Sequence, residues 1–250
     1  MYKAIDFLGI KVNAITKEEV VDKILEFALT DKHRIITYID AQCVNIFFRD
    51  PEYKKIIKKM DLVCAGGVGV VWASKLFRNS LPERVNSLDY FDRLAEGLIE
   101  KKIKIYLLGG KPGVVQKAVD ELKKRFSNLV IVGFHHGFFN EEQEDNIIKE
   151  INVLKPNILV VGMGVPRQEK WMYKQLNEAD VNLFWAVGAA FNSLSGAFKR
   201  APKWMISCGL EWLYRLYQEP NRLWKRYLVG NLVFIYRVLK YKITSRYLEK

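Results

Sequence analysis

Short apolar runs alternate with helix-like stretches over the first three-quarters of the chain. Runs rich in Ile, Leu and Val predict strands at residues 34–39, 61–64, 103–108, 129–132, 157–161 and 182–187. Near-continuous apolar runs of this length are typical of parallel strands buried on both faces. Between them, residues 17–29, 113–125 and 141–154 have helical periodicity, and Thr16 and Glu19 form a capping-box pattern before the first of these helices. The alternation predicts a doubly wound α/β fold, with a largely parallel sheet and helices on both faces.

The last 52 residues differ in composition from the rest of the chain. Residues 199–250 contain 12 of the 40 Lys and Arg residues but only three acids, so they carry nine of the net +12 charges. Aromatic residues are interleaved with these cations, which suits an anionic surface with an apolar interior, such as a lipid leaflet. We therefore predict a core at residues 1–195 and a helical, basic–aromatic, membrane-docking appendage at residues 196–250. A solvated basic helical hairpin is the alternative.

Bulk properties narrow the cellular setting. The N-terminal apolar stretch is interrupted by charges and lacks a cleavage-site pattern, so no signal peptide is predicted. The apolar stretch at residues 227–239 is shorter than the roughly 20 residues that a membrane span requires. Three scattered cysteines and three histidines form no recognisable zinc pattern. We expect a peripheral protein on the cytoplasmic face of the membrane, with reduced thiols and no structural metal.

Glycine is frequent where the predicted strands end. The segment Leu-Gly-Gly-Lys-Pro-Gly at residues 108–113 lies between a strand and a helix, where free backbone N–H groups can face a phosphate. It matches neither the dinucleotide-binding fingerprint nor the P-loop. A tight turn without a ligand is an equal interpretation of this motif alone.

Several motifs occur together, in an order that chance does not explain. They are Pro-Glu-Arg-Val at residues 82–85, His-His-Gly-Phe-Phe at 135–139, Gly-Met-Gly-Val-Pro-Arg-Gln-Glu-Lys-Trp at 162–171, and the C-terminal segments 199–202, 209–216 and 219–222. With these motifs, roughly residues 5–240 resemble the WecG/TagA/CpsF family of glycosyltransferases.

The resemblance implies a Rossmann-like fold and an inverting enzyme that needs no metal or other cofactor. It would transfer a sugar from a UDP-sugar to a polyprenyl-diphosphate-linked sugar, in teichoic acid or other surface-polysaccharide synthesis. Well-known family members transfer N-acetylmannosamine to lipid-linked N-acetylglucosamine. The chain itself contains no Asp-x-Asp metal motif. Arg215, Arg222 and Arg226, which match or lie near family arginines, are suited to bind the UDP diphosphate instead; contact with lipid phosphates is the alternative.

The resemblance also assigns roles to residues of the core. It places Gln168 in the active-site cleft as a catalytic residue that also contacts UDP, and His136 and Gly137 beside the nucleotide. For His136, the role of an ordinary buried histidine is the alternative. Arg84 and Asp89 are expected to bind substrate or to form a structural ion pair. The predicted UDP site is completed by Gly109, Gly110 and Met163.

The chain departs from the family pattern in the catalytic pocket. Tyr38-Ile-Asp-Ala-Gln replaces the usual Thr-Pro-Asn-Ala-Glu, Gly66 stands where the family has its proposed catalytic Asp, and Asn192 replaces another Asp. Our hypothesis is that the base has moved to Asp40, with Gly66 leaving room for it or for a larger sugar. An inactive homologue, or an Asp40 that only orients a hydroxyl, is the alternative. Tyr38 also makes a donor hexose other than N-acetylmannosamine a serious option, and we count Tyr38, Gly66 and Asn192 as substrate-binding.

Two other classes of function remain in competition. A sequence pI of about 9.5 and the basic–aromatic pattern are compatible with nucleic-acid binding, but no nucleic-acid motif is present, and we predict no nucleic-acid partner. The loss of the Asp at Gly66 also fits a catalytically impaired scaffold of a polymer-synthesis complex. The sequence leaves the donor, the acceptor, the linkage and homo-oligomerisation open.

Overall fold

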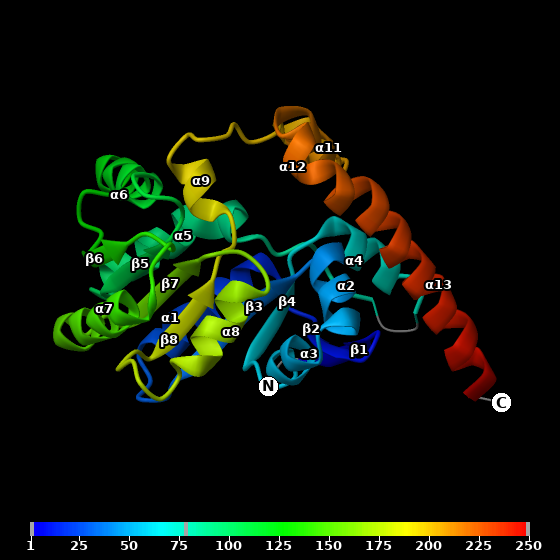
Figure 1. Ribbon diagram of the computed structural model, residues 1–250, viewed down its shortest axis with the longest axis horizontal. Coiled ribbons are helices and arrows are strands. Elements are labelled where there is room, and N and C mark those ends of the chain that lie inside the picture. Colours follow the sequence, from blue (N-terminus) through cyan, green and yellow to red (C-terminus); the bar gives the residue numbers. More distant parts are fainter. Residues whose placement is uncertain (1–2, 78–79, 249–250) are drawn as a thin grey trace.

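The computed structural model describes residues 3–77 and 80–248, with side chains as far as residue 244. The ends of the predicted core and appendage, residues 1–2 and 249–250, lie outside it. In the described part, six parallel strands form one sheet in the order β4-β3-β8-β7-β5-β6 (Figure 1). The strands are β3 (Arg34–Ile39), β4 (Leu62–Ala65), β5 (Ile105–Gly109), β6 (Ile131–His135), β7 (Ile158–Gly162) and β8 (Leu183–Ala186). All six predicted strands are confirmed, with ends that differ by three residues at most.

Helices cover both faces of this sheet, as predicted. One face packs against α1 (Lys17–Ala28), α5 (Ser87–Glu100) and α6 (Val114–Arg125). The other packs against α2 (Ala41–Arg49), α3 (Pro51–Ile57), α7 (Glu141–Leu154) and α8 (Arg167–Lys174). Because side chains alternate between the two faces of a strand, each central strand contributes to both layers.

An antiparallel hairpin precedes the sheet, and the apolar runs did not predict it. Strands β1 (Ala4–Phe7) and β2 (Ile10–Asn13) are joined by Leu8 and Gly9, both with positive φ. Buried and exposed residues alternate along the hairpin, so one side packs on the core while the other faces solvent. The Asn13 side chain accepts a hydrogen bond from the Val63 N–H at 2.9 Å, which ties the hairpin to β4.

The C-terminal segment crosses the carboxyl end of the sheet and then runs down its β4 side (Figure 1). It follows α9 (Ala190–Leu194) and comprises α10 (Lys203–Ser207), α11 (Glu211–Gln218), α12 (Pro220–Trp224), the π-helical turn η1 (Lys225–Val229) and α13 (Gly230–Leu248). No helix within the described residues is long and apolar enough to span a membrane.

Helix α13 is attached to the core by packing and hydrogen bonds. Phe234 and Val238 are buried in the same apolar cluster as the hairpin and α2. The Asn45 amide donates to the Gly230 carbonyl at 2.7 Å, and the Tyr241 hydroxyl donates to Asp6 at 3.1 Å. The appendage therefore shares part of the hydrophobic core of the domain.

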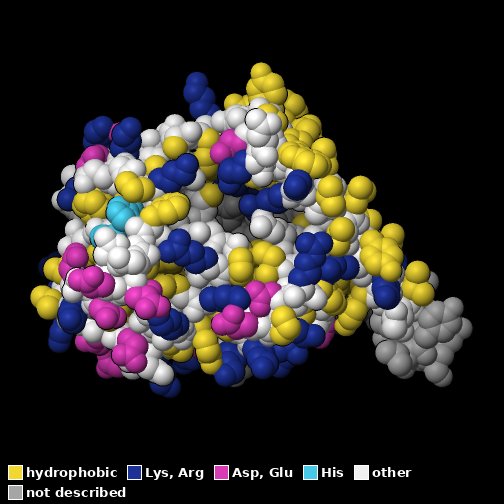
Figure 2. All heavy atoms as spheres, in the orientation of Figure 1, with side chains coloured by type: hydrophobic (Ala, Val, Ile, Leu, Met, Phe, Trp, Pro, Cys, Tyr) yellow, Lys and Arg dark blue, Asp and Glu magenta, His cyan; other side chains and the backbone are white. Residues whose placement is uncertain are grey.

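The opposite side of this segment exposes apolar side chains. Leu232 is 69% exposed and Tyr236 61%, although both lie in a helix that buries its other side. Figure 2 shows apolar side chains along the α12–α13 edge. This face consists of Leu228, Val229, Leu232, Ile235, Tyr236, Leu239 and Ile243, and we call it the outer α13 face.

Candidate active site

The glycine-rich loops after β5, β6 and β7 meet at the carboxyl edge of the sheet. The Gly110 N–H donates to the Gly162 carbonyl at 3.0 Å, and the Gly137 N–H donates to the Gly110 carbonyl at 2.9 Å. A Cβ on Gly137 would lie 3.1 Å from the Gly109 Cα and 3.3 Å from the Met163 side chain. Four of the predicted UDP-binding residues are thus brought together, and glycine is required at position 109, where a Cβ would clash with the Gly162 backbone.

His136 lies beside this cluster on the loop after β6. Its Nδ1 accepts a hydrogen bond from the Phe138 N–H at 3.3 Å, and its ring centre lies 4.3 Å from that of His135. The side chain is half-buried, so it is not an ordinary buried core histidine. A role beside the nucleotide stays a prediction.

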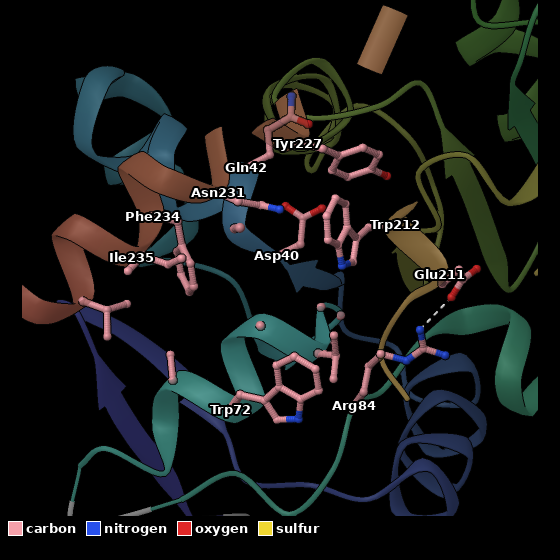
Figure 3. Close-up of a pocket in the computed structure, with 18 of the residues that line it drawn as sticks. Asp40, Gln42, Trp72, Arg84, Glu211, Trp212, Tyr227, Asn231, Phe234 and Ile235 are labelled. Carbon is pink, nitrogen blue, oxygen red and sulfur yellow. Dashed lines mark hydrogen bonds and ion pairs between the residues drawn. The ribbon is translucent and has the colours of Figure 1, made fainter. Parts of the chain in front are cut away.

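A pocket of about 460 Å³ opens at the carboxyl ends of β3 and β4, under the appendage (Figure 3). Its lining changes along its length. Figure 3 shows Arg84 and Glu211 on one side, Phe234 and Ile235 on the other, and Asp40 between them. The strand ends provide one wall, while α11, η1 and α13 provide the opposite wall.

Asp40 stands at the end of β3, where it is the N-cap of α2. One carboxylate oxygen accepts the Cys43 N–H at 2.9 Å, and the other binds the Arg226 guanidinium at 2.7 Å. Burial on its own would raise the pKa of Asp40, but Arg226 and the Cys43 hydrogen bond outweigh it and hold the pKa below its usual value. Asp40 is therefore a carboxylate held ionised by a cation from the appendage.

The structure assigns the space beside Asp40 to a different glycine from the one that we expected. A Cβ on Gly66 would lie 2.8 Å from the Tyr38 Cβ, so Tyr38 occupies that side. A Cβ on Gly67 would lie 2.9 Å from the Asp40 Cβ. Gly67 thus leaves the room beside Asp40, and an Asp cannot be placed at position 66 without moving the backbone.

The Tyr38 side chain points into the layer between the sheet and α5. Its hydroxyl accepts a hydrogen bond from the Trp185 indole at 2.6 Å and makes another with the Tyr90 hydroxyl. Burial raises the pKa of Tyr38, so this hydroxyl stays neutral. Although Gly66 lines the pocket beside Asp40, Tyr38 is not part of that lining. Substrate contact by Tyr38 therefore stays a prediction, and its observed contacts are with the core.

Gln168 joins the loops after β7 and β8 near the centre of the sheet. Its side-chain oxygen accepts from the Gly164 N–H at 3.3 Å and the Gly188 N–H at 3.2 Å, and its amide donates to Glu169 at 2.8 Å. The side chain is 3% exposed. In this arrangement Gln168 positions the two loops, and its predicted contact with substrate stays a prediction.

Glu169 is a buried carboxyl group to which our sequence analysis gave no role. One oxygen accepts from Gln168 and from the Thr37 hydroxyl at 3.0 Å, while the other has no hydrogen-bond partner. Burial raises the pKa of Glu169 to about 7. Glu169 lies on the buried side of α8 with Trp171 and Met172. An acid on the apolar side of a helical pattern is the sequence signal that could have identified this buried group.

Arg84 and Asp89 form an ion pair, which is the second of the two roles we considered. Arg84 binds Asp89 and Glu211, each at 2.7 Å, and Arg200 binds Asp89. Burial would lower the pKa of Arg84, but the two carboxylates raise it above its usual value. Two residues of this network come from the core and two from the segment after residue 195, so it fastens the appendage over the pocket. We missed Arg200 and Glu211.

The three predicted phosphate-binding arginines differ in their surroundings. Arg226 pairs with Asp40, and Arg215 lines the same pocket with its guanidinium 4.6 Å from the centre of the Phe198 ring. In both, the Nε atom is buried and lacks a hydrogen-bond partner. Arg222 is more exposed and binds Glu219, with Nε at 2.9 Å from the carboxylate. The structure brings Arg215 and Arg226 together at the pocket.

The last of the predicted site residues is Asn192. Asn192 is half-buried on α9, and its backbone carbonyl accepts hydrogen bonds from Ser195 and Phe198. Substrate contact by its side chain stays a prediction.

Figure 2 shows basic side chains around the hollow between the core and the α11–α12 segment. Within residues 3–77 and 80–248, no group of three or more His, Cys, Asp and Glu side chains is placed to hold a metal ion.

A Rossmann-like sheet with a charged, appendage-covered pocket at its carboxyl edge is typical of an enzyme that binds nucleotide-activated substrates. Residues 5–247 match the glycosyl transferase WecG/TagA/CpsF family, and the chain belongs to this family.

Similar proteins share one name. A Staphylococcus aureus (strain MW2) N-acetylglucosaminyldiphosphoundecaprenol N-acetyl-beta-D-mannosaminyltransferase is 29% identical over 244 residues, covering 95% of this chain and 93% of the relative. A Bacillus subtilis (strain 168) protein of the same name is 32% identical over 196 residues, covering 78% of this chain and 75% of the relative. The resemblance stated from the motifs is confirmed, and the chain is a glycosyltransferase.

Proposed function

We propose that this enzyme transfers N-acetylmannosamine or another hexose from a UDP-sugar to a sugar carried on a polyprenyl diphosphate, with inversion and without a metal. The names of the relatives support the acceptor, since they act on an N-acetylglucosaminyl-diphosphoundecaprenol. The observation that carries the proposal is the ion pair between Asp40 and Arg226 in the pocket. It joins a candidate base to a candidate phosphate ligand at one point.

The proposed reaction forms one bond and breaks one bond. The acceptor hydroxyl oxygen attacks the anomeric carbon of the donor, Asp40 takes the hydroxyl proton, and UDP departs with the electrons of the glycosidic bond. Charge grows on the departing diphosphate, and Arg215 and Arg226 are suited to offset it through bidentate contacts. The glycine cluster at Gly109, Gly110 and Gly137 is the proposed site for the nucleotide.

The exposed outer α13 face supports association with a membrane, where the acceptor would reside. The exposed Lys240 lies on the same helix as these apolar side chains, a combination suited to an anionic lipid surface. We propose that the protein is peripheral on the cytoplasmic face and that the appendage makes the contact.

A donor screen tests the reaction. Purified protein is incubated with single UDP-sugars and a short polyprenyl-diphosphate-N-acetylglucosamine, with EDTA present, and the products are read by mass spectrometry. We expect one UDP-sugar to give a disaccharide product of the acceptor. Binding of UDP without transfer from any donor would favour the scaffold interpretation instead.

Asp40→Asn tests the assignment of the base. Asn is also a good N-cap, so α2 should keep its start, whereas kcat should fall about 10²–10⁴-fold. Near-normal kcat in this variant would eliminate Asp40 as the base.

A further inference from the structure

The pocket at Asp40 continues into a groove between two helices. Helix α4 (Val68–Ser74) and the residues just after it contribute Gly69, Trp72, Ala73 and Leu76. Helix α13 contributes Asn231, Phe234, Ile235, Val238 and Leu239. Both sets recur at helical spacings of three and four, so each helix presents one stripe to the groove.

The groove changes from polar to apolar along its length. The lining from the C-terminal helical run begins at Arg226 and Tyr227, passes Asn231, and ends in Val238 and Leu239. Thirteen residues of helix rise about 20 Å. A ligand lying along this run would therefore have its anionic part near Arg226 and its apolar part beside the C-terminal half of the stripe.

The apolar end opens onto the protein surface. Trp72 is 51% exposed, Leu76 44%, Ile235 50% and Leu239 50%, and all four line the groove. Ile235 and Leu239 also belong to the outer α13 face. A hydrocarbon chain leaving the groove would stay in contact with apolar side chains, which lowers the free energy of the bound chain.

The polar end is suited to an anion. Arg215 lines it without an ion pair to a carboxylate within the described residues, and both Arg215 and Arg226 have a buried Nε atom that lacks a hydrogen-bond partner. Such groups are costly to leave unsatisfied, and a diphosphate oxygen would satisfy them.

We infer that this groove binds the first isoprene units of the acceptor lipid, with the acceptor sugar at Asp40 and the acceptor diphosphate on the groove side of Arg226, whose remaining N–H donors can still face the departing UDP diphosphate. The inference rests on the proposed function and adds the location of the lipid chain. A pocket of about 460 Å³ is of the size that holds a small ligand, so the remainder of a long prenyl chain would continue over the outer α13 face.

Gly69 offers a way to fill the groove from inside. A Cβ at this position would lie 3.7 Å from the Phe234 ring, in ordinary contact. Gly69→Ala therefore adds one methyl group at the wall, while Gly69→Leu places a larger side chain in the space that we assign to the prenyl chain. Both changes favour the helix.

The test measures binding of farnesyl diphosphate and of inorganic diphosphate by calorimetry, using the full-length chain. We expect Gly69→Leu to weaken farnesyl diphosphate binding at least about tenfold and Gly69→Ala about twofold. Binding of inorganic diphosphate should be the same in all three proteins. Equal farnesyl diphosphate affinity in all three would overturn the inference.

Ile235→Gln with Leu239→Gln gives a second test, at half-exposed positions that tolerate polar side chains. Farnesyl diphosphate binding should weaken about fivefold, again without a change for inorganic diphosphate. Dodecyl phosphate serves as a straight-chain probe. If it binds as tightly as farnesyl diphosphate and responds equally to Gly69→Leu, the groove is a general acyl site and the assignment to prenyl chains is wrong.

Transfer assays on the same variants separate this inference from the proposed function. Groove-dependent farnesyl diphosphate binding without sugar transfer would contradict the function and leave the groove assignment standing. Sugar transfer to a prenyl acceptor with the same KM in wild type and Gly69→Leu would contradict the groove assignment and leave the proposed function standing.

Discussion

The two ends of the carboxyl edge are built in different ways. At β5, β6 and β7, backbone groups of Gly109, Gly110 and Gly137 pack against one another, and all three lie at or just after the ends of strands in local motifs. At β3 and β4, side chains create the site, and Asp40 is paired with Arg226 from 186 residues away. The first end is complete without the appendage, whereas the second depends on it.

Truncation after Ser195 should separate the two ends most strongly. It removes Arg200, Glu211, Arg215 and Arg226, and we expect kcat to fall at least about 10³-fold because the charge on departing UDP loses its cations. It also exposes the apolar surface that Phe234 covers, so the melting temperature should fall. UDP binding measured by calorimetry should be reduced much less than turnover. A truncated protein with wild-type kcat would reduce the appendage to an anchor.

Arg226→Ala probes the pairing with Asp40 directly. Burial raises the pKa of Asp40, whereas Arg226 and the Cys43 hydrogen bond lower it, so removing the guanidinium should raise the pKa of Asp40. The carboxylate would then be lost at higher pH as the solution is acidified. We expect the acidic limb of the kcat/KM profile to move to higher pH and the maximum to fall about 10²–10³-fold. Arg222→Ala is the matched control and should leave the acidic limb in place. An acidic limb that does not move in Arg226→Ala would contradict the role of the Asp40–Arg226 pair.

Glu169→Gln tests the buried carboxyl group that lies between the two ends. The pKa of about 7, against an ordinary 4.5, corresponds to roughly 3 kcal/mol. Because the folded state holds the proton more tightly, this group makes the free energy of unfolding fall as pH rises from about 4.5 to 7, with little change above.

Glu169→Gln should therefore flatten that pH dependence, as measured by urea unfolding at pH 5 and pH 8. Glu121→Gln, on the exposed side of α6, is the control. If the free energy of unfolding depends on pH as strongly in Glu169→Gln as in wild type, the Glu169 carboxyl group is not the source of that dependence.

Glu211→Gln should have the smallest effect of the four. It removes one carboxylate from the Arg84 network, which is only partly exposed, and we expect a loss of about 1–3 kcal/mol in the free energy of unfolding. Glu219→Gln breaks an exposed pair with Arg222 and should cost less than about 1 kcal/mol. Equal losses in the two variants would contradict the fastening role of the network.

Gly66 shows the limit of reading a site from motifs. The motif located the departure from the family, and it also led us to expect free space beside Asp40. The direction of the missing Cβ, toward Tyr38, depends on how β3 and β4 approach each other. The sequence near residue 66 does not determine how closely β3 and β4 approach each other at this point.

The sequence by itself determined the strands, their parallel arrangement and the glycine-rich loops, because burial on both faces and tight turns leave local patterns. It also determined the family and marked the basic C-terminal segment as distinct. Tertiary structure decided which charges meet: Asp40 with Arg226, and Arg84 with Glu211. It also decided that α4 and α13 form a groove with one polar and one apolar end. These features join residues more than 100 positions apart, and the packing of α11, η1 and α13 on the core, which no local pattern encodes, sets their distances.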